Sequence, residues 1–357
     1  MRTLIAGVGA LGGTIATRAI AAGIPIWLAT RSAESARALR STGMKVSGTG
    51  GSASVASVKA ATMEEYEKAD KFDLIVLATK AHDALDVAPF LARLLSADGT
   101  LLPIQNGCVS QLLFDHYGDK VVAGGLSTLS ATMVEPGVYE QTNAGYLLIG
   151  ELTGGLTDRV ARILQALKGG IEVKASPNFS GAVWAKLLIN CSVTTIGAVA
   201  GQTMRHYIAT SAGMKVFRNA YDETLRIALA AGVRPERMIV EPTPPGWDGA
   251  KSGLGANYDA WVEKIIVTYG DLKPSMLQDF ERGRRTEIDF INGYVAQLGG
   301  KIGMSAPLNA AIAETVHLIE QGHIQPGSVR LEELARRYAS INEEFERGSH
   351  FTIRQAP

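Results

Sequence analysis

Lys186 is a charged residue in a segment that should otherwise be buried. It is the only Asp, Glu, Lys or Arg between Ala175 and Met204, and apolar side chains lie on nearly every side of the helix predicted there. A buried ammonium is costly unless it is paired or neutral, so we interpret Lys186 as a proton donor with a lowered pKa. The alternative is a lysine whose head reaches solvent. Asn190 follows one helical turn later, on nearly the same line.

Glu287 stands in a second apolar pattern, nearer the C-terminus. Steps of three and four residues predict one long amphipathic helix with the stripe Leu277, Phe280, Ile288, Ile291, Val295 and Leu298. Glu287 falls inside this stripe, so it either pairs with Arg284 or faces a polar cavity. Ser275, after Pro274, is expected to cap this helix together with Gln278 in the S-x-x-Q pattern.

A glycine motif near the start of the chain predicts a second binding site, separate from the one around Lys186. An apolar run at 3–6 leads into a helical pattern, and a second apolar run follows at 24–28. In a strand-to-helix turn of this kind the first glycine allows the turn, the second lets a pyrophosphate approach and the third lets the helix pack on the strand. The helix N–H groups then face the phosphates. The motif is Gly7-Val8-Gly9-Ala10-Leu11-Gly12. We interpret it as a dinucleotide site, and a structural turn is the alternative.

Polar residues at the ends of three predicted strands extend this site. Arg31 stands where an NAD-specific fold usually carries an acid for the ribose 2′-hydroxyl, and it suits a 2′-phosphate instead. NADP(H) is therefore expected, and a solvated surface arginine is the alternative. Lys80 and Asn106 follow the apolar runs 72–78 and 101–104, at the strand ends where ligands of parallel sheets bind. For Asn106, a turn with the following glycine is the alternative.

Composition limits the class of protein. The 35 basic and 35 acidic residues cancel, so no net charge points to nucleic acid or to an anionic membrane. Two cysteines exclude a disulfide framework and suit the cytoplasm, and the six histidines show no metal-ligand spacing, so no metal is expected. We expect no signal peptide before the first strand. The apolar run 187–200 is too short and too polar for a membrane span, which predicts a buried core helix.

The order of patterns predicts two domains in an α/β protein. Strands and helices alternate as far as 171–174, which indicates a doubly wound Rossmann-type domain at 1–177. Only helical patterns follow, so 178–340 is expected to be an all-helical domain, with a loose tail at 341–357. The connection 234–274 is irregular and rich in Pro and Gly, as lids and interaction surfaces often are.

Several blocks of this sequence resemble the ketopantoate reductase family, from the first strand to about His317. They are the glycine motif, Thr79-Lys80-Ala81, Gln105-Asn106-Gly107, Trp184-Ala185-Lys186-Leu187-Leu188-Ile189-Asn190-Cys191, Ser275-Met276-Leu277-Gln278-Asp279 and Arg285-Thr286-Glu287-Ile288-Asp289-Phe290-Ile291-Asn292-Gly293. The resemblance implies NADPH-dependent reduction of 2-dehydropantoate (ketopantoate) to D-pantoate, in pantothenate biosynthesis, at a cleft between a Rossmann domain and a helical domain.

The resemblance also implies a role for each candidate residue. Lys186 corresponds to the catalytic lysine. Arg31 and Lys80 correspond to cofactor-side positions, and Asn106 to a position close to both nicotinamide and substrate. Three residues correspond to substrate-binding positions, the last of them also important for turnover: Asn190, Ser275 and Glu287. The chemistry agrees, because hydride delivery builds negative charge on a ketone oxygen that an ammonium can stabilise and protonate.

Two features depart from the family's pattern. Thr194, at a substrate-binding position, and Thr195 stand where the family often has asparagine and proline, and the connection 234–274 is longer than usual. Both fall on the substrate side, so an enzyme acting on another 2-keto or 2-hydroxy acid is the alternative, and a non-catalytic NADP(H) sensor is a third. The expected partner is a small 2-keto acid, with no nucleic acid and no membrane; a homodimer is left open.

Overall fold

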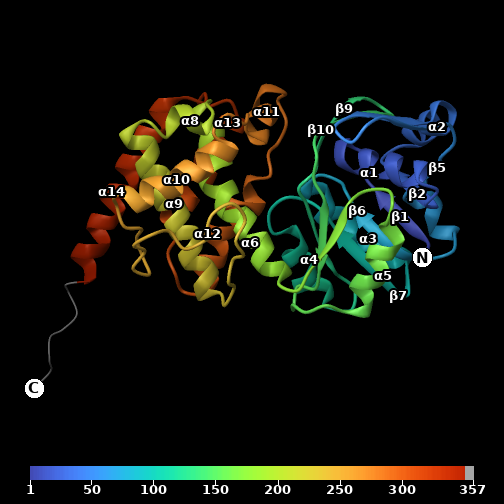
Figure 1. Ribbon diagram of the computed structural model, residues 1–357, viewed down its shortest axis with the longest axis horizontal. Coiled ribbons are helices and arrows are strands. Elements are labelled where there is room, and N and C mark those ends of the chain that lie inside the picture. Colours follow the sequence, from blue (N-terminus) through green and yellow to red (C-terminus); the bar gives the residue numbers. More distant parts are fainter. Residues whose placement is uncertain (350–357) are drawn as a thin grey trace, which may run out of the picture. The chain divides into compact units, whose positions relative to one another are not determined.

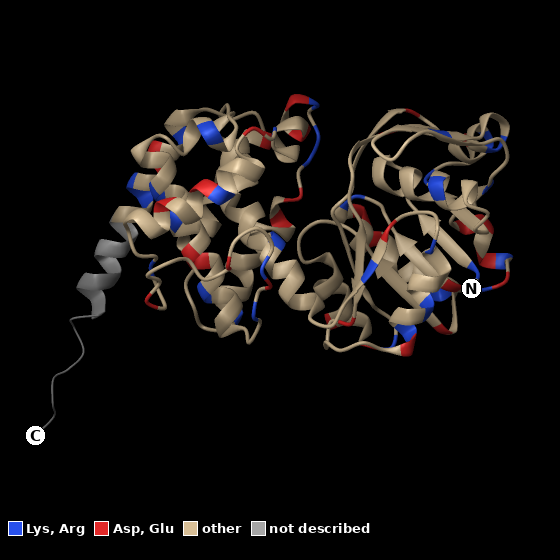
Figure 2. Cartoon of the chain, in the orientation of Figure 1, with Lys and Arg blue, Asp and Glu red and all other residues tan. Residues whose placement is uncertain are grey.

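The computed structural model describes the backbone of residues 1–349 and the side chains of residues 1–339. The chain divides into two compact units, Met1–Ser180 and Gly181–Pro357, so the division follows residue 180 where the sequence predicted 177. Figure 1 shows the first unit in blue to green and the second in green to red. Lys and Arg are interspersed with Asp and Glu over both units (Figure 2).

The first unit is an α/β domain. Its strands are β1 Thr3–Ala6, β2 Ile26–Thr30, β3 Met44–Gly48, β4 Ala53–Val55, β5 Lys59–Thr62, β6 Phe72–Leu77, β7 Leu95–Pro103, β8 Gly124–Ser127, β9 Ser130–Glu135, β10 Val138–Asn143, β11 Leu147–Gly150 and β12 Val173–Ser176. Its helices are α1 Ala10–Ala21, α2 Ala33–Thr42, the short η1 Glu64–Lys68, α3 Ala81–Leu94, α4 Val109–Tyr117 and α5 Asp158–Leu167.

A five-stranded parallel sheet forms the centre of this unit. Its strand order is β5-β2-β1-β6-β7, and every neighbouring pair is parallel. Successive strands run outward from β1 in one direction as far as β5 and then in the other through β6 and β7. The order therefore reverses between β1 and β6, which is the topological switch point where doubly wound sheets bind ligands. The expected Rossmann-type architecture is confirmed.

Helix α1 lies between this sheet and a second one. It packs on β1 and β2, and its other side contacts the four-stranded sheet β4-β3-β10-β9. Tyr139 of β10 is buried against α1, since a Cβ on Gly13 would lie 2.1 Å from its ring. A third sheet has the order β12-β11-β8. The start of α1 is thus held from both sides.

The strands β3, β4, β5 and β9 were not expected. They are short, and β4 falls in the Gly/Ser-rich stretch that reads as a loop. Side-chain contacts far apart in sequence stabilise this region: Arg18 donates to Gln141 Oε1 at 2.7 Å and to the carbonyl oxygens of Thr49, Gly50 and Gly51. Local pattern carries no trace of such contacts, which is why the sequence misses these strands.

The second unit contains only helices among its described residues. They are α6 Phe179–Ile189, the π-helical turn η2 Asn190–Thr194, α7 Thr195–Ala200, α8 Met204–Tyr207, α9 Ser211–Ala230, α10 Ala256–Tyr269, α11 Ser275–Glu281, the 3₁₀ turn η3 Ile288–Phe290, α12 Asn292–Lys301, α13 Pro307–Glu320 and α14 Ser328–Ser349. An α/β domain followed by a helical one is what the sequence predicted.

The segments α6, η2 and α7 form one continuous rod of 22 residues, Phe179–Ala200. The rod begins earlier than the run at 187–200 expected from sequence, and by length and composition alone it could cross a membrane. However, 78% of its most apolar window is buried inside the structure. A buried rod of this kind is the central helix around which the second unit packs.

The long helix expected over 277–298 is wrong. Helix α11 ends at Glu281, and α12 starts only at Asn292. Between them, Gly283 adopts a φ of +59° and the Thr286 N–H donates to Glu320 Oε1 rather than along a helix. The apolar spacing is therefore shared by three short elements that pack on the same core.

The capping box expected at Ser275 is also wrong. Pro274 is the N-cap of α11 and makes no side-chain cap bond, so Ser275 is the first helical residue. The Gln278 side chain instead points to the Lys273 carbonyl, 3.5 Å away. The Ser275 hydroxyl makes no hydrogen bond within the part of the chain that the structure describes, so capping does not account for this serine.

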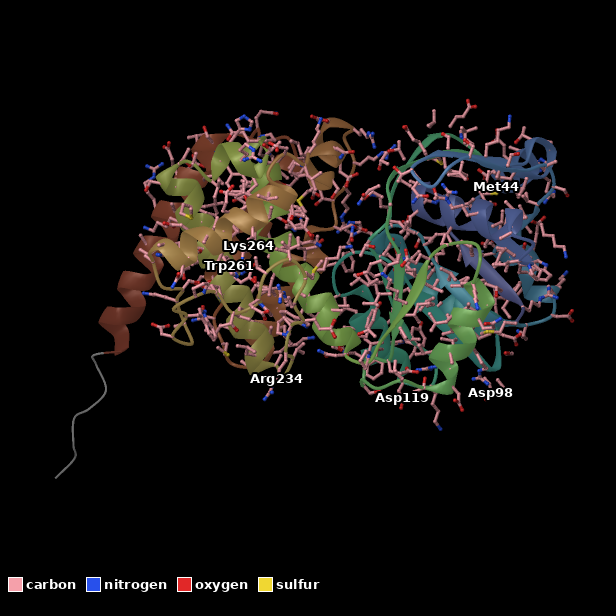
Figure 3. All side chains as sticks on the ribbon, in the orientation of Figure 1. Met44, Asp98, Asp119, Arg234, Trp261 and Lys264 are labelled. Atoms are coloured by element: carbon pink, nitrogen blue, oxygen red, sulfur yellow. The ribbon has the colours of Figure 1, made fainter. Side chains whose placement is uncertain are left out.

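The connection 234–274 is ordered by buried anchors and contains helix α10. The carboxylate of Asp222 on α9 accepts bonds from the backbone N–H and the hydroxyl of Ser252. Trp261, labelled in Figure 3, donates from Nε1 to the Glu241 carbonyl at 2.9 Å and packs edge-on against Tyr221. The connection is therefore part of the packed unit.

The C-terminal end is more helical than expected. Helix α14 extends to Ser349, so residues 341–349, placed by the sequence in a loose tail, are helical. The remainder of that predicted tail, 350–357, lies outside the described residues.

Candidate functional site

The turn from β1 to α1 has the geometry of a phosphate-binding loop. Gly7 has a φ of +99°, and a Cβ there would lie 2.6 Å from the Thr79 nitrogen. A Cβ on Gly9 would meet nothing within 4 Å, so the space over this residue is open to a ligand. Gly9 is also the N-cap of α1, with no side-chain cap bond and no acid in the first turn. The N–H groups that open α1 are thus suited to an anion.

Gly12 brings helix and strand together. A Cβ at this position would lie 2.1 Å from the Gly7 oxygen and 2.8 Å from the Ala78 Cβ. Each of the three glycines therefore has the environment that the motif predicts. Tyr139 adds a contact that the sequence did not suggest, because its hydroxyl donates to the Val8 carbonyl at 3.3 Å.

The ends of β6 and β7 carry polar atoms without partners. Gln105 Nε2 donates to the carbonyls of Leu77 and Thr79, at 2.9 and 3.0 Å, and so ties the two strand ends together. Thr79 Oγ1 and Gln105 Oε1 are buried and find no hydrogen-bond partner among the described residues. Buried polar atoms are normally satisfied, and these two lie beside the glycine loop. The residues present therefore fit a polar ligand such as a dinucleotide.

The predicted cofactor residues lie around this edge of the sheet. Lys80 is the exposed N-cap of α3, and Asn106 is half-buried before Gly107, whose φ is +71°. Arg31 follows β2, its side chain 84% exposed, and pairs with Asp83 at 2.5 Å. An exposed ion pair of this kind is worth little, so the guanidinium can exchange Asp83 for a phosphate at small cost.

Three of the predicted substrate residues lie on the rod 179–200. Its residues are buried except for five that are half-buried, spaced three or four apart: Ser180, Val183, Lys186, Asn190 and Thr194. Steps of this size follow one face of a helix. The predicted residues Lys186, Asn190 and Thr194 thus lie along the one accessible stripe of this rod.

A π-helical turn keeps these residues in line. In an α-helix, residues four apart are about 40° out of line, and the wider turn Asn190–Thr194 opposes that drift. Its carbonyls have outside donors: Asn292 Nδ2 bonds the Cys191 oxygen at 3.2 Å, and the Tyr207 hydroxyl lies 3.2 Å from the oxygens of Ser192 and Val193. Turns of this type are frequent at functional sites.

The negative charge of Glu287 affects the pKa of Lys186. Burial lowers the pKa of Lys186 from 10.5 to about 8, and the Glu287 carboxylate acts in the opposite direction. Both residues are half-buried, Lys186 on α6 and Glu287 immediately before η3. A lysine that ionises near neutral pH can both donate and recover a proton.

Ser275 belongs to a neighbouring element. Helix α11, which it begins, packs on α7 of the central rod. On its other side lies a hollow of about 490 Å³, lined by Leu277, Phe280, Arg284, Arg285 and Glu320 among others. This hollow contains none of the predicted site residues. In the part of the chain that the structure describes, no group of three His, Cys, Asp or Glu side chains could hold a metal ion.

Four residues that bond the glycine loop, the strand ends or the π-helical turn were not singled out from sequence. Gln105 and Asn292 lie inside quoted blocks, where only neighbouring residues drew attention. Tyr139 and Tyr207 are distant in sequence from the loops that they bond, and no local pattern marks them. Contacts between remote segments become visible only in the fold.

A glycine loop at the switch point of a parallel sheet, followed by a helical unit with a half-buried lysine, is typical of nicotinamide-dependent oxidoreductases. Matches to family models identify the family within this class of oxidoreductases. "Ketopantoate reductase PanE/ApbA" matches residues 3–154, and its C-terminal counterpart matches residues 178–320. The chain belongs to the ketopantoate reductase family, whose members are oxidoreductases acting on a ketone or its alcohol.

Individual relatives agree with this assignment. The 2-dehydropantoate 2-reductase of Archaeoglobus fulgidus is 26% identical over 324 residues, which cover 90% of this chain and 98% of that protein. The Pyrococcus horikoshii enzyme of the same name is 29% identical over 247 residues, covering 67% and 73%.

Solved structures share the fold. A PanE/ApbA family ketopantoate reductase from Ralstonia eutropha JMP134 superposes with a TM-score of 0.74 at 24% identity, covering 90% of this chain and 99% of that one. D-mandelate dehydrogenase in complex with NADH and anilino(oxo)acetate gives a TM-score of 0.74 at 22% identity, with the same coverage.

The glycine loop yields a matched pair of variants. Gly12→Ala should lower the free energy of unfolding by about 2 kcal/mol or more, because its methyl group overlaps the Gly7 oxygen and Ala78. Gly9→Ala should change it by less than about 1 kcal/mol yet weaken dinucleotide binding, because its methyl group occupies the open space. Urea denaturation and calorimetric titration measure the two effects. Equal stability losses, or normal binding by Gly9→Ala, would contradict these assignments.

Proposed function

We propose that this chain reduces a 2-keto acid with NADPH and that Lys186 is the general acid. The observation that carries the proposal is the half-buried Lys186 on an apolar rod, with its pKa lowered to about 8. Asn190 and Thr194 on the same stripe, and Glu287 beside it, supply the polar groups that a keto acid needs. The two cysteines of the described residues, both buried and outside any disulfide, suit the cytoplasm that we propose as its location.

The residues act on the carbonyl in a defined way. A nicotinamide cofactor, which the glycine loop around Gly7, Gly9 and Gly12 would hold, would supply the hydride to the carbonyl carbon when bound. Negative charge then builds on the carbonyl oxygen, where the Lys186 ammonium stabilises it and transfers a proton from Nζ. Glu287 keeps Lys186 protonated, since its charge raises the pKa that burial lowers. Asn190 hydrogen-bonds the substrate, the Ser275 hydroxyl holds its carboxylate, and Glu287 accepts a bond from a substrate hydroxyl.

We propose 2-dehydropantoate as the first candidate substrate, reduced to D-pantoate, because relatives that cover 90% of this chain are named 2-dehydropantoate 2-reductase. A second candidate is a 2-keto acid with another side chain. It is favoured by Thr194, whose hydroxyl donates to the Asn190 carbonyl at 3.2 Å and is thereby engaged by the helix itself. A substrate beside it then meets the threonine methyl group. The fold shared with D-mandelate dehydrogenase accommodates such a substrate.

A substrate panel decides between these candidates. With saturating NADPH, we expect kcat/KM for 2-dehydropantoate to exceed that for pyruvate by tenfold or more. The panel should also contain 2-keto acids with branched and aromatic side chains. A higher kcat/KM for one of these establishes the second candidate. Absence of turnover with every 2-keto acid, despite NADPH binding, would favour the third hypothesis, a non-catalytic NADP(H) sensor.

Lys186 is expected to control the pH dependence of reduction. A general acid must be protonated, so kcat for reduction should fall as the pH rises through about 8. Lys186→Ala should lower kcat by about 10²- to 10⁴-fold and abolish this pH dependence, while NADPH binding persists. Lys215→Ala, at an exposed lysine of α9, is the matched control. An unchanged kcat in Lys186→Ala would remove the assignment.

Arg31 is expected to select the cofactor. Arg31→Ala should weaken NADPH binding by tenfold or more and NADH binding little, because only NADPH offers a 2′-phosphate to the guanidinium. Arg162→Ala, at an exposed arginine of α5, serves as the control. Dissociation constants from fluorescence titration measure both cofactors, and equal losses would show that Arg31 does not read the phosphate.

A further inference from the structure

Glu287 lies on a segment with little helical structure. Residues 282–291 join α11 to α12, and only the short η3 turn interrupts their irregular path. Gly283, near the start, has a φ of +59°, and Ile291, at the end, has φ and ψ of −114° and −103°. The position of Glu287 must therefore be fixed by contacts from neighbouring elements.

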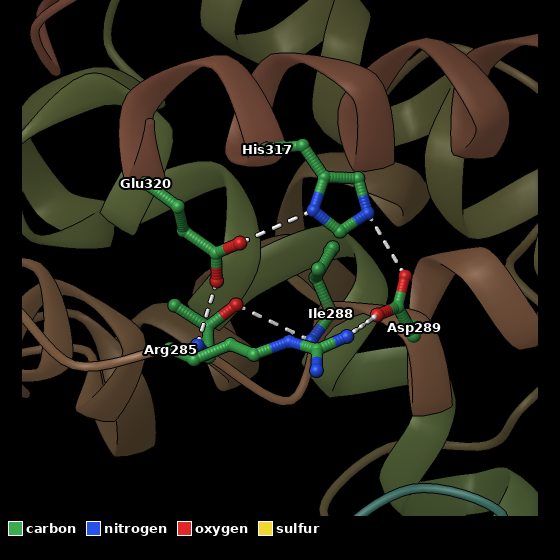
Figure 4. Close-up of polar contacts among 6 residues, drawn as sticks. Arg285, Ile288, Asp289, His317 and Glu320 are labelled. Atoms are coloured by element: carbon green, nitrogen blue, oxygen red, sulfur yellow. Dashed lines mark hydrogen bonds and ion pairs between the residues drawn. The ribbon is translucent and has the colours of Figure 1, made fainter. Parts of the chain in front are cut away.

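One turn of α13 supplies such contacts on both sides of Glu287. Glu320 Oε1 accepts the backbone N–H of Thr286, immediately before Glu287, at 2.6 Å. His317 Nε2 lies 2.9 Å from Asp289 Oδ1, two residues after Glu287. His317 Nδ1 is 3.1 Å from Glu320 Oε2, which joins the two contacts to each other. Figure 4 shows this chain of polar contacts from helix to segment.

The charges of this group favour a fixed arrangement. Glu320 and Asp289 carry carboxylates, which only accept hydrogen bonds when ionised, and each lies next to one ring nitrogen of His317. Arg285 places a cation on Asp289, with its Nη2 3.1 Å from Oδ2. Glu320 is only 13% exposed and Asp289 33%, so solvent screens these contacts less than it screens a surface pair.

We propose that His317, Glu320 and Asp289 are positioning residues that hold Glu287 beside Lys186. We call these three residues the brace. None of them belongs to the rod 179–200, and the brace acts through the backbone on either side of Glu287. Its effect on turnover rests on the proposed function, whereas its effect on Lys186 does not.

Two variants remove the brace, and one restores part of it. Glu320→Ala removes the acceptor for Thr286, and His317→Leu removes both ring contacts. Glu320→Gln retains an oxygen for Thr286 and is the conservative partner of the alanine variant. Glu314→Ala is the matched control, because Glu314 lies on the same helix and only its exposed pair with Arg337 is lost.

The first measurement needs no turnover. Lysine labelled with ¹³C at Cε reports the titration of Lys186 by NMR, with the signal assigned through Lys186→Arg. Because Glu287 raises the pKa of Lys186, Glu320→Ala and His317→Leu should lower that pKa, while Glu320→Gln should lower it less and Glu314→Ala not at all. A wild-type titration in both brace variants would overturn the proposal.

The second measurement is steady-state kinetics with the best 2-keto acid. Misplacing a group by about 1 Å can cost up to 10²-fold, so we expect kcat/KM to fall by about tenfold or more in both brace variants. The Kd for NADPH should stay within twofold of wild type. A wild-type kcat/KM in both variants would also overturn the proposal. If the wild-type protein reduces no 2-keto acid, the proposed function fails. The Lys186 titration then still tests whether the brace holds Glu287 beside Lys186.

Discussion

The burial of one ammonium group, that of Lys186, is the main electrostatic constraint on the second unit. Removing Lys186 from water on an apolar rod is costly, and the lowered pKa measures that cost, offset in part by the carboxylate of Glu287. A lysine on the surface would keep its proton at neutral pH and make a poor acid. The rod is buried on every side but one, so the same packing that stabilises the unit also lowers the pKa of Lys186.

The accessible stripe of the rod depends on a buried polar network. Asn292 donates to the π-turn carbonyl of Cys191 and to Asn309 Oδ1. Asn309 is held in turn by Glu223, whose carboxylate also accepts the backbone N–H groups that open α13. Helices α9, α12 and α13 therefore share one set of hydrogen bonds with the turn between Asn190 and Thr194. The side chains of Asn292, Asn309 and Glu223 are themselves buried, so these bonds are shielded from water.

The parts of this molecule that sequence reveals are those with a local physical signature. The glycine motif requires particular residues at particular backbone positions, and Lys186 and Glu287 are marked by charge in apolar surroundings. The break between α11 and α12 has no such signature, because the apolar spacing continues through residues that are not helical. Thr286 is bonded to Glu320, 34 residues away, and a contact of that separation cannot be read from periodicity. The pairing of Arg18 with the β3–β4 turn escaped prediction for the same reason.

The π-turn carries a consequence for how this fold can diversify. Deleting one residue between Asn190 and Thr194 would convert it into an ordinary α-turn and leave the helix beyond it nearly in place, because about five residues of a π-turn cover the same rotation as about four of an α-helix. The buried residues beyond the turn, Ala198, Val199 and Ala200 among them, would then keep their packing, and only the side chains of the turn itself would change place. A change in chain length at this one place thus changes which side chains follow Lys186 on the accessible stripe while the rest of the rod keeps its place. Insertions and deletions, and not substitutions alone, can therefore alter the accessible stripe of this rod.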